Sequence, residues 1–442
     1  MQVLQIILAL SILVLIHELG HFTFARIFGI RIDKFFLFFD AGGVKLFSTK
    51  APWFLKICPK AADWETEYGI GWLPLGGYCK VNGMIDESMD TEHLKNEPQP
   101  WEFRSKPAWQ RLLVMFGGVL FNFILGILLF SFSLFKWGDA YIPSDKNCVY
   151  VYEGSLADEM GFRSGDTIIA LDGEKPEDFR EIQIDIARDM VKKVTVLREG
   201  IETDIYIDRK HISDLLNTQL FDLAIPFIIK DITDESLNKE ADIRPGDRIT
   251  MIDTTAIAFV QDALPLLDAK AGQNITATIL RDSTSITMPL QVDEQGNIGV
   301  YFQIPNFEKM SYSFLESIPA GCIKAYDATI GQIKDLRLLA KPSTGAYKSV
   351  GSIIAITDAM PQQWNWPVFI NMLAMISIIL AVMNLLPIPA LDGGHIVFTL
   401  YEMITGRKPS DRFLLVMQLI GMVLIFGLMF LAFGNDIARL LK

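Results

Sequence analysis

The sequence predicts a polytopic α-helical membrane protein with four transmembrane helices and two β-rich domains inserted between the second and third helices. Half of the 442 residues are hydrophobic and only 21% are charged. The hydrophobic residues are concentrated in four stretches, and the chain between these stretches has the composition of a water-soluble protein. In addition, an 18-residue segment between the second and third stretches recurs farther along the chain.

The charge balance excludes several classes of protein. The formal net charge is −12, so the chain has no overall positive field that would attract nucleic-acid phosphates. The high hydrophobic fraction also argues against a disordered chain or a coiled coil. The four cysteines are far apart and form no CxxC pair, so we expect scattered free thiols. A disulfide between Cys148 and Cys322 would require both residues to face an oxidising compartment.

Each hydrophobic stretch is long enough to cross a bilayer. Residues 112–135 contain no charge, and these 24 residues would extend about 36 Å as a helix, against a hydrocarbon layer of about 30 Å. The first stretch does not look like a cleavable signal peptide, because no Lys or Arg precedes it and no small-residue cleavage site follows it. The predicted transmembrane helices occupy residues 1–28, 109–137, 364–395 and 412–434.

The basic residues predict the orientation of these helices. They flank the first and third connections, as Arg26, Arg31, Lys34, Arg104, Lys106, Arg111, Arg407, Lys408 and Arg412. We therefore expect a cytoplasmic segment at 29–108 and both termini outside, although Arg439 and Lys442 are a contrary signal. The segment between the second and third helices would then be extracytoplasmic, and periplasmic if the chain lies in a bacterial inner membrane.

This extracytoplasmic segment contains an internal repeat. SLADEMGFRSGDTIIALD (155–172) aligns without gaps on SLNKEADIRPGDRITMID (236–253), with eight identical positions. In each copy a short helix-like piece leads to a Gly-Asp turn and then to an alternating strand. The repeat predicts two β-rich domains, at 145–215 and 221–302. Between them and the third span, at 303–363, the spacing of apolar residues predicts an amphipathic helix near the outer membrane face, or a plain bridging helix.

Ionisable residues occur within the first hydrophobic stretch, in IHELGHFTFARIFG. A charged side chain inside a span costs roughly 2.5–3.5 kcal/mol, so these groups must be paired, hydrated or coordinated. On a helix His17 and His21 lie one turn apart on one face, so their imidazoles can converge on one cation while Glu18 lies beside them. This HExxH pattern is typical of a zinc site with a general base. The alternative is histidines packed inside a helix bundle.

The third stretch supplies a candidate for a further ligand. Catalytic zinc sites usually have three protein ligands, and this stretch ends in NLLPIPALDGGH. Pro387 and Pro389 must break the helix there, and Asp392 follows the break. We expect Asp392 to be the third ligand, with His395 as a weaker candidate and a solvated loop carboxylate as the alternative. The other histidines, His93 and His211, lie in soluble segments.

These motifs together resemble the site-2 protease family of intramembrane zinc metalloproteases. The resemblance covers essentially the whole chain and includes LPLGGYCKVNGM (73–84) and FRSKPAWQRLLV (103–114). It implies one Zn²⁺ per chain, the metal ligands His17, His21 and Asp392, and Glu18 as the catalytic base.

The same resemblance assigns roles outside the metal site. It implies that Asn384 contacts the substrate. The two β-rich domains in turn resemble PDZ domains, through the Gly-Asp run that each copy of the repeat contains. PDZ domains bind extended peptides by adding a strand to a sheet edge, although here they would serve equally well as steric screens or spacers. FGGVLFNF departs from the family pattern AGPxxN: Asn122 is kept, but Val119 replaces proline. The segment 348–356 also lacks the proline of the family pattern.

The function implied by the resemblance is regulated intramembrane proteolysis. Its substrates would be single-span membrane proteins such as pre-cleaved anti-sigma factors, and remnant signal peptides. Because a helix shields its carbonyl groups, the enzyme must hold the substrate unwound. We expect a membrane-associated β-hairpin around Gly76, Gly77 and Tyr78 to offer a strand edge for this purpose, or to be merely structural. Two alternatives are a non-proteolytic PDZ scaffold and a transporter of metal ions or protons.

Overall fold

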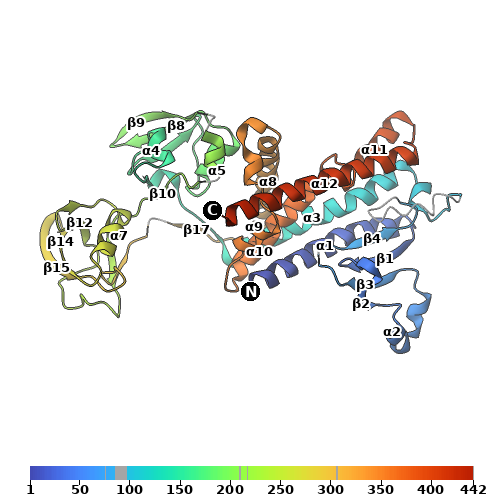
Figure 1. Ribbon diagram of the computed structural model, residues 1–442, viewed down its shortest axis with the longest axis horizontal. Coiled ribbons are helices and arrows are strands. Elements are labelled where there is room, and N and C mark those ends of the chain that lie inside the picture. The colour runs from blue at the N-terminus through green and yellow to red at the C-terminus, as the bar shows by residue number, and fades with distance from the viewer. Residues whose placement is uncertain (75, 85–96, 209–210, 217, 305–306, 442) are drawn as a thin grey trace. The chain divides into compact units, whose positions relative to one another are not determined.

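The computed structural model describes residues 1–74, 76–84, 97–208, 211–216, 218–304 and 307–441 (Figure 1). The chain divides into two compact units, each of which is described by itself. The first unit comprises Met1–Gly138, Ser311–Arg337 and Tyr347–Lys442. The second comprises Asp139–Met310 and Leu338–Ala346.

Among the residues that the structure describes, four helices of the first unit are long and apolar enough to cross a membrane. They are α1 (Gln2–Ile27), α3 (Ala108–Trp137), α10 (Trp366–Leu385) and α12 (Asp411–Leu440). The prediction of a helical membrane protein with four such helices is therefore confirmed. The other α-helices of this unit are α2 (Pro52–Ile57), α9 (Ile353–Ala359), α11 (Asp392–Thr405) and α8 (Phe314–Leu339), whose last two residues belong to the second unit.

Helix α3 is the centre of the helix bundle, because it packs against α1, α10 and α11. The backbones of α1 and α3 approach closely at two glycines, where a Cβ atom on Gly20 would overlap the carbonyl group of Gly117. Val119 is fully buried in the uninterrupted α3. The helix therefore runs straight through the position where the sequence lacks the expected proline.

The third hydrophobic stretch is broken, as its prolines required. Helix α10 ends at Leu385, a turn contains Pro387 and Pro389, and α11 begins at Asp392. The predicted segment 364–395 thus contains one helix and the start of a second, and the second helix was not expected. Ala390, in the turn, has a φ of +88°, a conformation that strains a residue with a Cβ atom.

A four-stranded sheet follows α1. Its strands are β1 (Ile32–Leu37), β2 (Lys45–Ser48), β3 (Glu67–Gly71) and β4 (Tyr78–Val81), in the order β2-β3-β1-β4. The expected β-hairpin around Gly76 and Gly77 is wrong, because β3 and β4 do not pair with each other. Both pair with β1, which lies between them, β3 in parallel and β4 antiparallel. Leu73 crosses the end of β1 and bonds to Phe39, so β4 becomes an edge strand.

The second unit is rich in β-strands and contains two separate hydrophobic cores. Its strands are β5 (Asp139–Tyr141), β6 (Val149–Tyr150), β7 (Thr167–Leu171), β8 (Lys193–Arg198), β9 (Ile201–Tyr206), β10 (Asp222–Leu223), β11 (Ile229–Ile232), β12 (Arg248–Ile252), β13 (Thr255–Ala256), β14 (Asn274–Arg281), β15 (Thr284–Gln291), β16 (Val300–Phe302) and β17 (Glu308–Met310). Its helices are α4 (Leu156–Met160), α5 (Ile182–Arg188), α6 (Ile212–Leu215) and α7 (Val260–Ala269). The main sheets are β7-β8-β9 and β13-β12-β14-β15.

The sequence repeat corresponds to a repeated turn. In the first copy the Asp166 carboxylate accepts from the N–H of Arg163 and from the guanidinium of Arg198. In the second copy Asp247 accepts in the same way from Arg244 and Arg281. Hydrogen bonds from Arg281 lower the pKa of Asp247. The helix-like piece before this turn is a helix only in the first copy, as α4, and is a series of turns in the second.

Candidate metal centre

Three side chains from two helices converge on one point in the first unit. The Nε2 atoms of His17 and His21 are 3.2 Å apart on α1. The Oδ2 atom of Asp392, at the start of α11, is 3.2 Å from Nε2 of His17 and 3.3 Å from Nε2 of His21. Among the described residues this is the one group of three or more His, Cys, Asp or Glu side chains that meets the spacing of a metal site.

The centre lies within the length of a transmembrane helix. His17 follows the first residue of α1 by fifteen positions, which corresponds to about 22 Å along a helix. The hydrocarbon layer of a bilayer is about 30 Å thick. If α1 crosses the membrane, the three converging groups are therefore inside it.

The glycines after Asp392 place this carboxylate. A Cβ atom on Gly393 would overlap the carbonyl oxygen of Leu386, and one on Gly394 would lie 2.7 Å from the carbonyl oxygen of Ile388. Only glycine lets the first turn of α11 pack this closely against the turn that follows α10. The two glycines of the LDGG pattern thus allow Asp392 to lie close to α1 after the prolines have ended helix α10.

Both imidazoles are oriented by a bond at Nδ1. Nδ1 of His21 is 2.9 Å from the carbonyl oxygen of Val114, which can only accept, so Nδ1 carries the proton and Nε2 keeps its lone pair. Nδ1 of His17 is 3.2 Å from the side-chain amide of Asn122, whose buried Oδ1 has no partner. Turning this amide by 180° directs Oδ1 at an Nδ1–H donor and satisfies both groups.

The three converging atoms fit a metal ion. With protons on both Nδ1 atoms, the two Nε2 atoms and Oδ2 of Asp392 are all electron-pair donors that face one another. Oδ2 is also buried without a hydrogen-bond partner, which a divalent cation would supply. Ligand atoms about 2.05 Å from a tetrahedral zinc ion lie about 3.3 Å from one another, which agrees with the distances of 3.2 and 3.3 Å.

Helix α3 leaves room for the two imidazoles at Gly118. A Cβ atom on this residue would lie 2.6 Å from Cε1 of His17 and 2.6 Å from Nε2 of His21. In the sequence, FGGVLFNF stands out only by its missing proline, and no local pattern gives a role to Gly118 or Asn122. Both lie on α3, and their position relative to α1 depends on helix packing rather than on any local pattern.

Glu18 lies beside the centre, next to the edge of the sheet. It is half-buried and interacts electrostatically with His17, His21 and Asp392. Cys79 in β4 lies beside its carboxylate. The edge strand is therefore adjacent to the candidate general base.

The predicted substrate-binding residues are in different surroundings. A Cβ atom on Gly77 would lie 2.8 Å from Val14 on α1, so this segment packs one turn before His17. The Tyr78 hydroxyl instead donates to Asp40 at 2.8 Å, and its ring stacks on Phe36. Asn384 is half-buried in the last turn of α10.

The remaining candidates do not join the centre. His395 is outside the three-residue group, and His211 is 4.0 Å from Asp214 in the second unit. His93 lies outside the described residues. The four cysteines are free thiols, in agreement with the expectation of scattered thiols.

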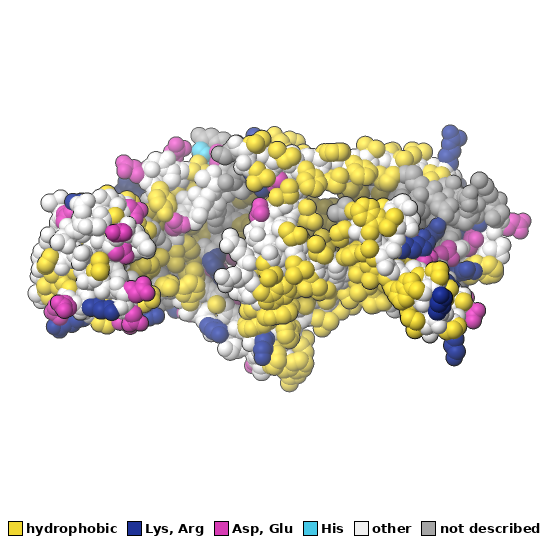
Figure 2. Space-filling model, turned by 60° about the horizontal axis from the view of Figure 1, so that its bottom comes forward, with side chains coloured by type: hydrophobic (Ala, Val, Ile, Leu, Met, Phe, Trp, Pro, Cys, Tyr) yellow, Lys and Arg dark blue, Asp and Glu magenta, His cyan; other side chains and the backbone are white. Residues whose placement is uncertain are grey.

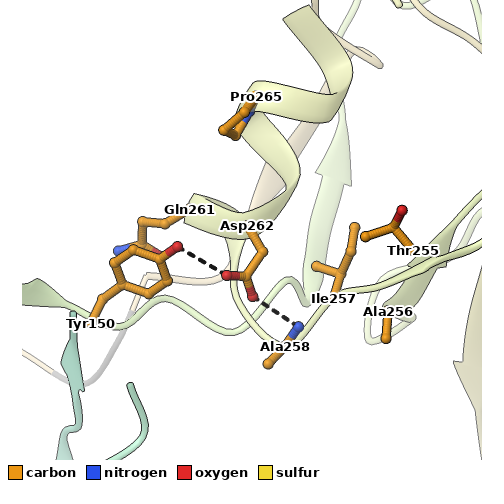
Figure 3. A pocket seen from close by; sticks show the side chains of 8 residues that line it. All are labelled: Tyr150, Thr255, Ala256, Ile257, Ala258, Gln261, Asp262 and Pro265. Atoms are coloured by element: carbon orange, nitrogen blue, oxygen red, sulfur yellow. Dashed lines mark hydrogen bonds between the residues drawn. The ribbon is translucent and has the colours of Figure 1, made fainter. Parts of the chain in front are cut away.

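A hollow in the second unit lacks such chemistry. It has a volume of about 520 Å³ and lies between Tyr150 and α7 (Figure 3). The Tyr150 hydroxyl donates to Asp262 at 2.9 Å, and burial together with this bond raises the pKa of Tyr150 to about 12. Asp262 also accepts from the N–H of Ala258. No histidine or cysteine lines this hollow, so the metal centre in the first unit remains the candidate active site.

Apolar spanning helices around two histidines, an aspartate and an adjacent glutamate define a membrane-embedded metallohydrolase. The chain belongs to Peptidase family M50, because the sequence model of this family matches residues 5–428. The predicted membership of the site-2 protease family is thus confirmed. The chain is a zinc metalloprotease of a bacterial membrane, so the scaffold and transporter alternatives are set aside.

Similar proteins cover the whole chain. The regulator of sigma-E protease RseP of Escherichia coli is 27% identical over 98% of this chain and 98% of its own length. The regulator of sigma E protease of Haemophilus influenzae is 26% identical, again over 98% of each chain. A Ralstonia nicotianae protein described as a zinc metalloprotease is 26% identical over 100% of this chain and 99% of its own.

Proposed function

We propose that this chain cleaves single-span membrane proteins inside the bilayer, with His17, His21 and Asp392 as the ligands of one zinc ion and Glu18 as the catalytic base. The observation that carries the proposal is the convergence of three electron-pair donors at zinc-ligand spacing, two from the spanning helix α1 and one from α11. Their Nδ1 bonds direct both imidazoles inward, and the unpartnered carboxylate oxygen completes the set.

The chain's own groups would divide the chemistry between them. Bound zinc supplies a Lewis acid that activates water and polarises a peptide carbonyl. Glu18 accepts the proton of the attacking water and then delivers it to the leaving amine, so that one proton is taken and returned per bond cleaved. Strand β4, at Cys79, lies beside the Glu18 carboxylate in both transfers.

The edge strand β4 is the natural place for an unwound substrate. A substrate in extended conformation exposes the carbonyl groups that a helix hides, and an edge strand can pair with it. We assign Gly76, Gly77 and Tyr78 to this role because the segment packs against α1 beside Glu18. Asn384 is proposed to contact the substrate from the end of α10.

The substrates and topology follow from the relatives and from the charge pattern. Proteins named regulators of sigma E protease support anti-sigma factors and remnant signal peptides as substrates. We assign the regions 145–215 and 221–302 to two PDZ domains on the periplasmic side of the inner membrane, with both termini on that side. They either bind peptides or exclude substrates with bulky outer domains.

Metal content and cleavage of a labelled transmembrane peptide test the proposal together. The purified protein should contain one zinc ion per chain, and a chelator should abolish cleavage until zinc is restored. Glu18→Gln should lose cleavage and retain zinc, whereas His17→Ala should lose both. Cleavage by a metal-free protein, or undiminished cleavage by Glu18→Gln, would contradict the assignment.

A further inference from the structure

The chain leaves the four-stranded sheet between β2 and β3 to form a separate lobe. This lobe contains α2 and a short 3-10 helix, η2 (Pro59–Asp63). The Lys50 ammonium closes the lobe by donating to the carbonyl oxygens of Ala61, Ala62 and Trp64 at 3.0, 2.9 and 2.7 Å. The lobe is therefore a built structure whose outer surface is fixed.

The outer surface of the lobe and of the adjoining strand β2 is apolar and aromatic. Ile57 is 74% exposed, Leu46 68% and Trp53 52%. Leu46 and Trp53 line one shallow hollow of about 270 Å³. The Trp53 ring is held by edge contacts with Phe47 at 5.8 Å and Phe54 at 5.7 Å between ring centroids. Such a surface indicates a binding partner, because transfer of large apolar side chains from water to an apolar environment is favourable.

The charges around this surface are positive, in contrast to the chain as a whole. Residues 45–64 contain four lysines and one aspartate, whereas the chain carries a formal net charge of −12. Lys45 pairs with Glu67 at 2.6 Å, and Lys50 is occupied by the three carbonyl groups. Lys56 and Lys60 are exposed, and neither has an ion pair among the described residues. The partner must therefore accept apolar and cationic side chains together.

The lobe is fixed at the level where α1 ends. Glu65, directly after the lobe, pairs with Arg26 in the last turn of α1 at 3.0 Å. Arg26 follows the first residue of α1 by 24 positions, about 36 Å along the helix. This exceeds the hydrocarbon thickness of about 30 Å, so Arg26 and the lobe lie at headgroup level if α1 crosses the membrane.

The figures show this arrangement within the first unit. In Figure 1, α2 lies at the end of the sheet farthest from α1, displaced to the side of the helix bundle rather than in line with it. In Figure 2, hydrophobic side chains in this lower right region surround dark blue lysine or arginine side chains. A surface that lies beside the end of a membrane-spanning helix, at headgroup level, is placed next to the lipids that surround that helix.

We propose that α2 docks on the surface of the membrane that α1 crosses, with a preference for anionic lipid. Trp53 and Ile57 enter the boundary between headgroups and acyl chains, as interfacial tryptophans and amphipathic helices do. Lys56 and Lys60 contact the lipid phosphates. Because β2 and β4 belong to the same sheet, this docking also holds the edge strand beside Glu18 at a constant depth.

Fluorescence of Trp53 tests the depth of the lobe. The full-length protein is reconstituted into phosphatidylcholine bilayers containing phosphatidylglycerol, and the Trp53→Phe spectrum is subtracted from that of the wild type. Lipids brominated near the headgroup end of their acyl chains should reduce this difference signal at least two-fold, and aqueous iodide should leave it unchanged. Retention of bound zinc by Trp53→Phe shows that the variant is folded.

Two other quenching results would overturn the proposal. Quenching by iodide but not by brominated lipid would place Trp53 in water. Protection from both quenchers would place it against protein, either a second copy of this chain or another partner.

The lysines test the preference for anionic lipid. In mixed bilayers, replacing Lys56 and Lys60 together by Gln should lower the ratio of lipid-quenched to iodide-accessible Trp53 about 30-fold, since each lysine near an anionic surface contributes about 1 kcal/mol. In pure phosphatidylcholine the same variant should behave as the wild type. The matched control replaces Lys230 and Lys239 of the second unit by Gln and should change nothing. An equal effect in both variants, or none in either, would contradict the anionic preference.

Discussion

The amide of Asn122 determines which nitrogen of His17 is available to a metal ion. Asn122 is fully buried on α3, 3.2 Å from Nδ1 of His17. Replacing Asn122 by Ala leaves the Nδ1–H group buried without an acceptor, which costs about 1–3 kcal/mol. It also lets the proton move to Nε2, where it blocks the metal. This penalty corresponds to about 5- to 160-fold weaker zinc binding, which overlaps the 10- to 100-fold typical of lost partners of metal-bound histidines.

Competition with a chromogenic chelator measures this loss on the zinc-depleted protein. The matched control is Ser377→Ala, because the Ser377 hydroxyl donates to the backbone carbonyl of Asn122 at 2.8 Å and does not touch the imidazole. Its zinc Kd should stay within two-fold of the wild type. Asn122→Asp restores an acceptor for Nδ1–H and should recover most of the lost affinity.

Either of two results would refute this reasoning. If Asn122→Ala binds zinc as tightly as the wild type, the bond to His17 does not orient the ligand. If Ser377→Ala weakens zinc binding as much as Asn122→Ala, the effect comes from packing of α3 against α10 rather than from the amide.

Three further predictions concern other contacts. Gly118→Ala should lower zinc binding more than ten-fold, measured by metal analysis of the folded protein, because the new Cβ atom would lie 2.6 Å from both imidazoles; full zinc occupancy would contradict it. Cys79→Pro alters the backbone of β4 beside Glu18 and should lower kcat more than ten-fold with zinc retained, whereas Cys79→Ser keeps the backbone N–H and should cleave normally. Hydrogen bonds from Arg281 lower the pKa of Asp247, so their stabilisation is present above the unfolded pKa of about 3.9 and is lost as the pH falls through the lower folded pKa. Asp247→Asn should therefore reduce the Tm of the second unit at pH 7 and flatten its decrease below pH 4, and an unchanged profile would contradict this.

The sequence indicated those parts of the site that depend on local periodicity. The i, i+4 spacing of His17 and His21 needs only a helix, and the two prolines before Asp392 require a break wherever the chain packs. The supporting residues are different, since Asn122 is 105 positions from His17 in the chain. Their contact depends on how α3 crosses α1. A single sequence shows the periodicity of each helix but not how two helices cross. The contact of Asn122 with His17 therefore could not be predicted.

The sheet shows the same limit at the level of strands. Alternating residues around Gly76 and Gly77 indicated a strand correctly, but a strand's partner is not encoded in its own pattern. The chain passes over the end of β1 at Leu73, so β4 pairs with β1 and not with β3. In this order β4 is an edge strand of the sheet, and it lies beside Glu18.

Glycines mark the closest backbone contacts of the centre, and their clustering is a signal that sequence reasoning could have used. A Cβ atom would meet neighbouring atoms at Gly20, Gly118, Gly393 and Gly394, each within three residues of a candidate ligand or on the helix that faces the ligands. Three ligand atoms about 3.3 Å apart require their helices to approach more closely than side-chain packing permits. Close approach of helices therefore leaves a sign in the sequence, namely paired glycines in apolar helices that otherwise contain large residues. Gly117–Gly118 and Gly393–Gly394 are such pairs. From the sequence alone, Gly393–Gly394 indicates only a tight turn, and Gly117–Gly118 indicates no particular contact. The reason is that a glycine does not show which side chain fills the space beside it.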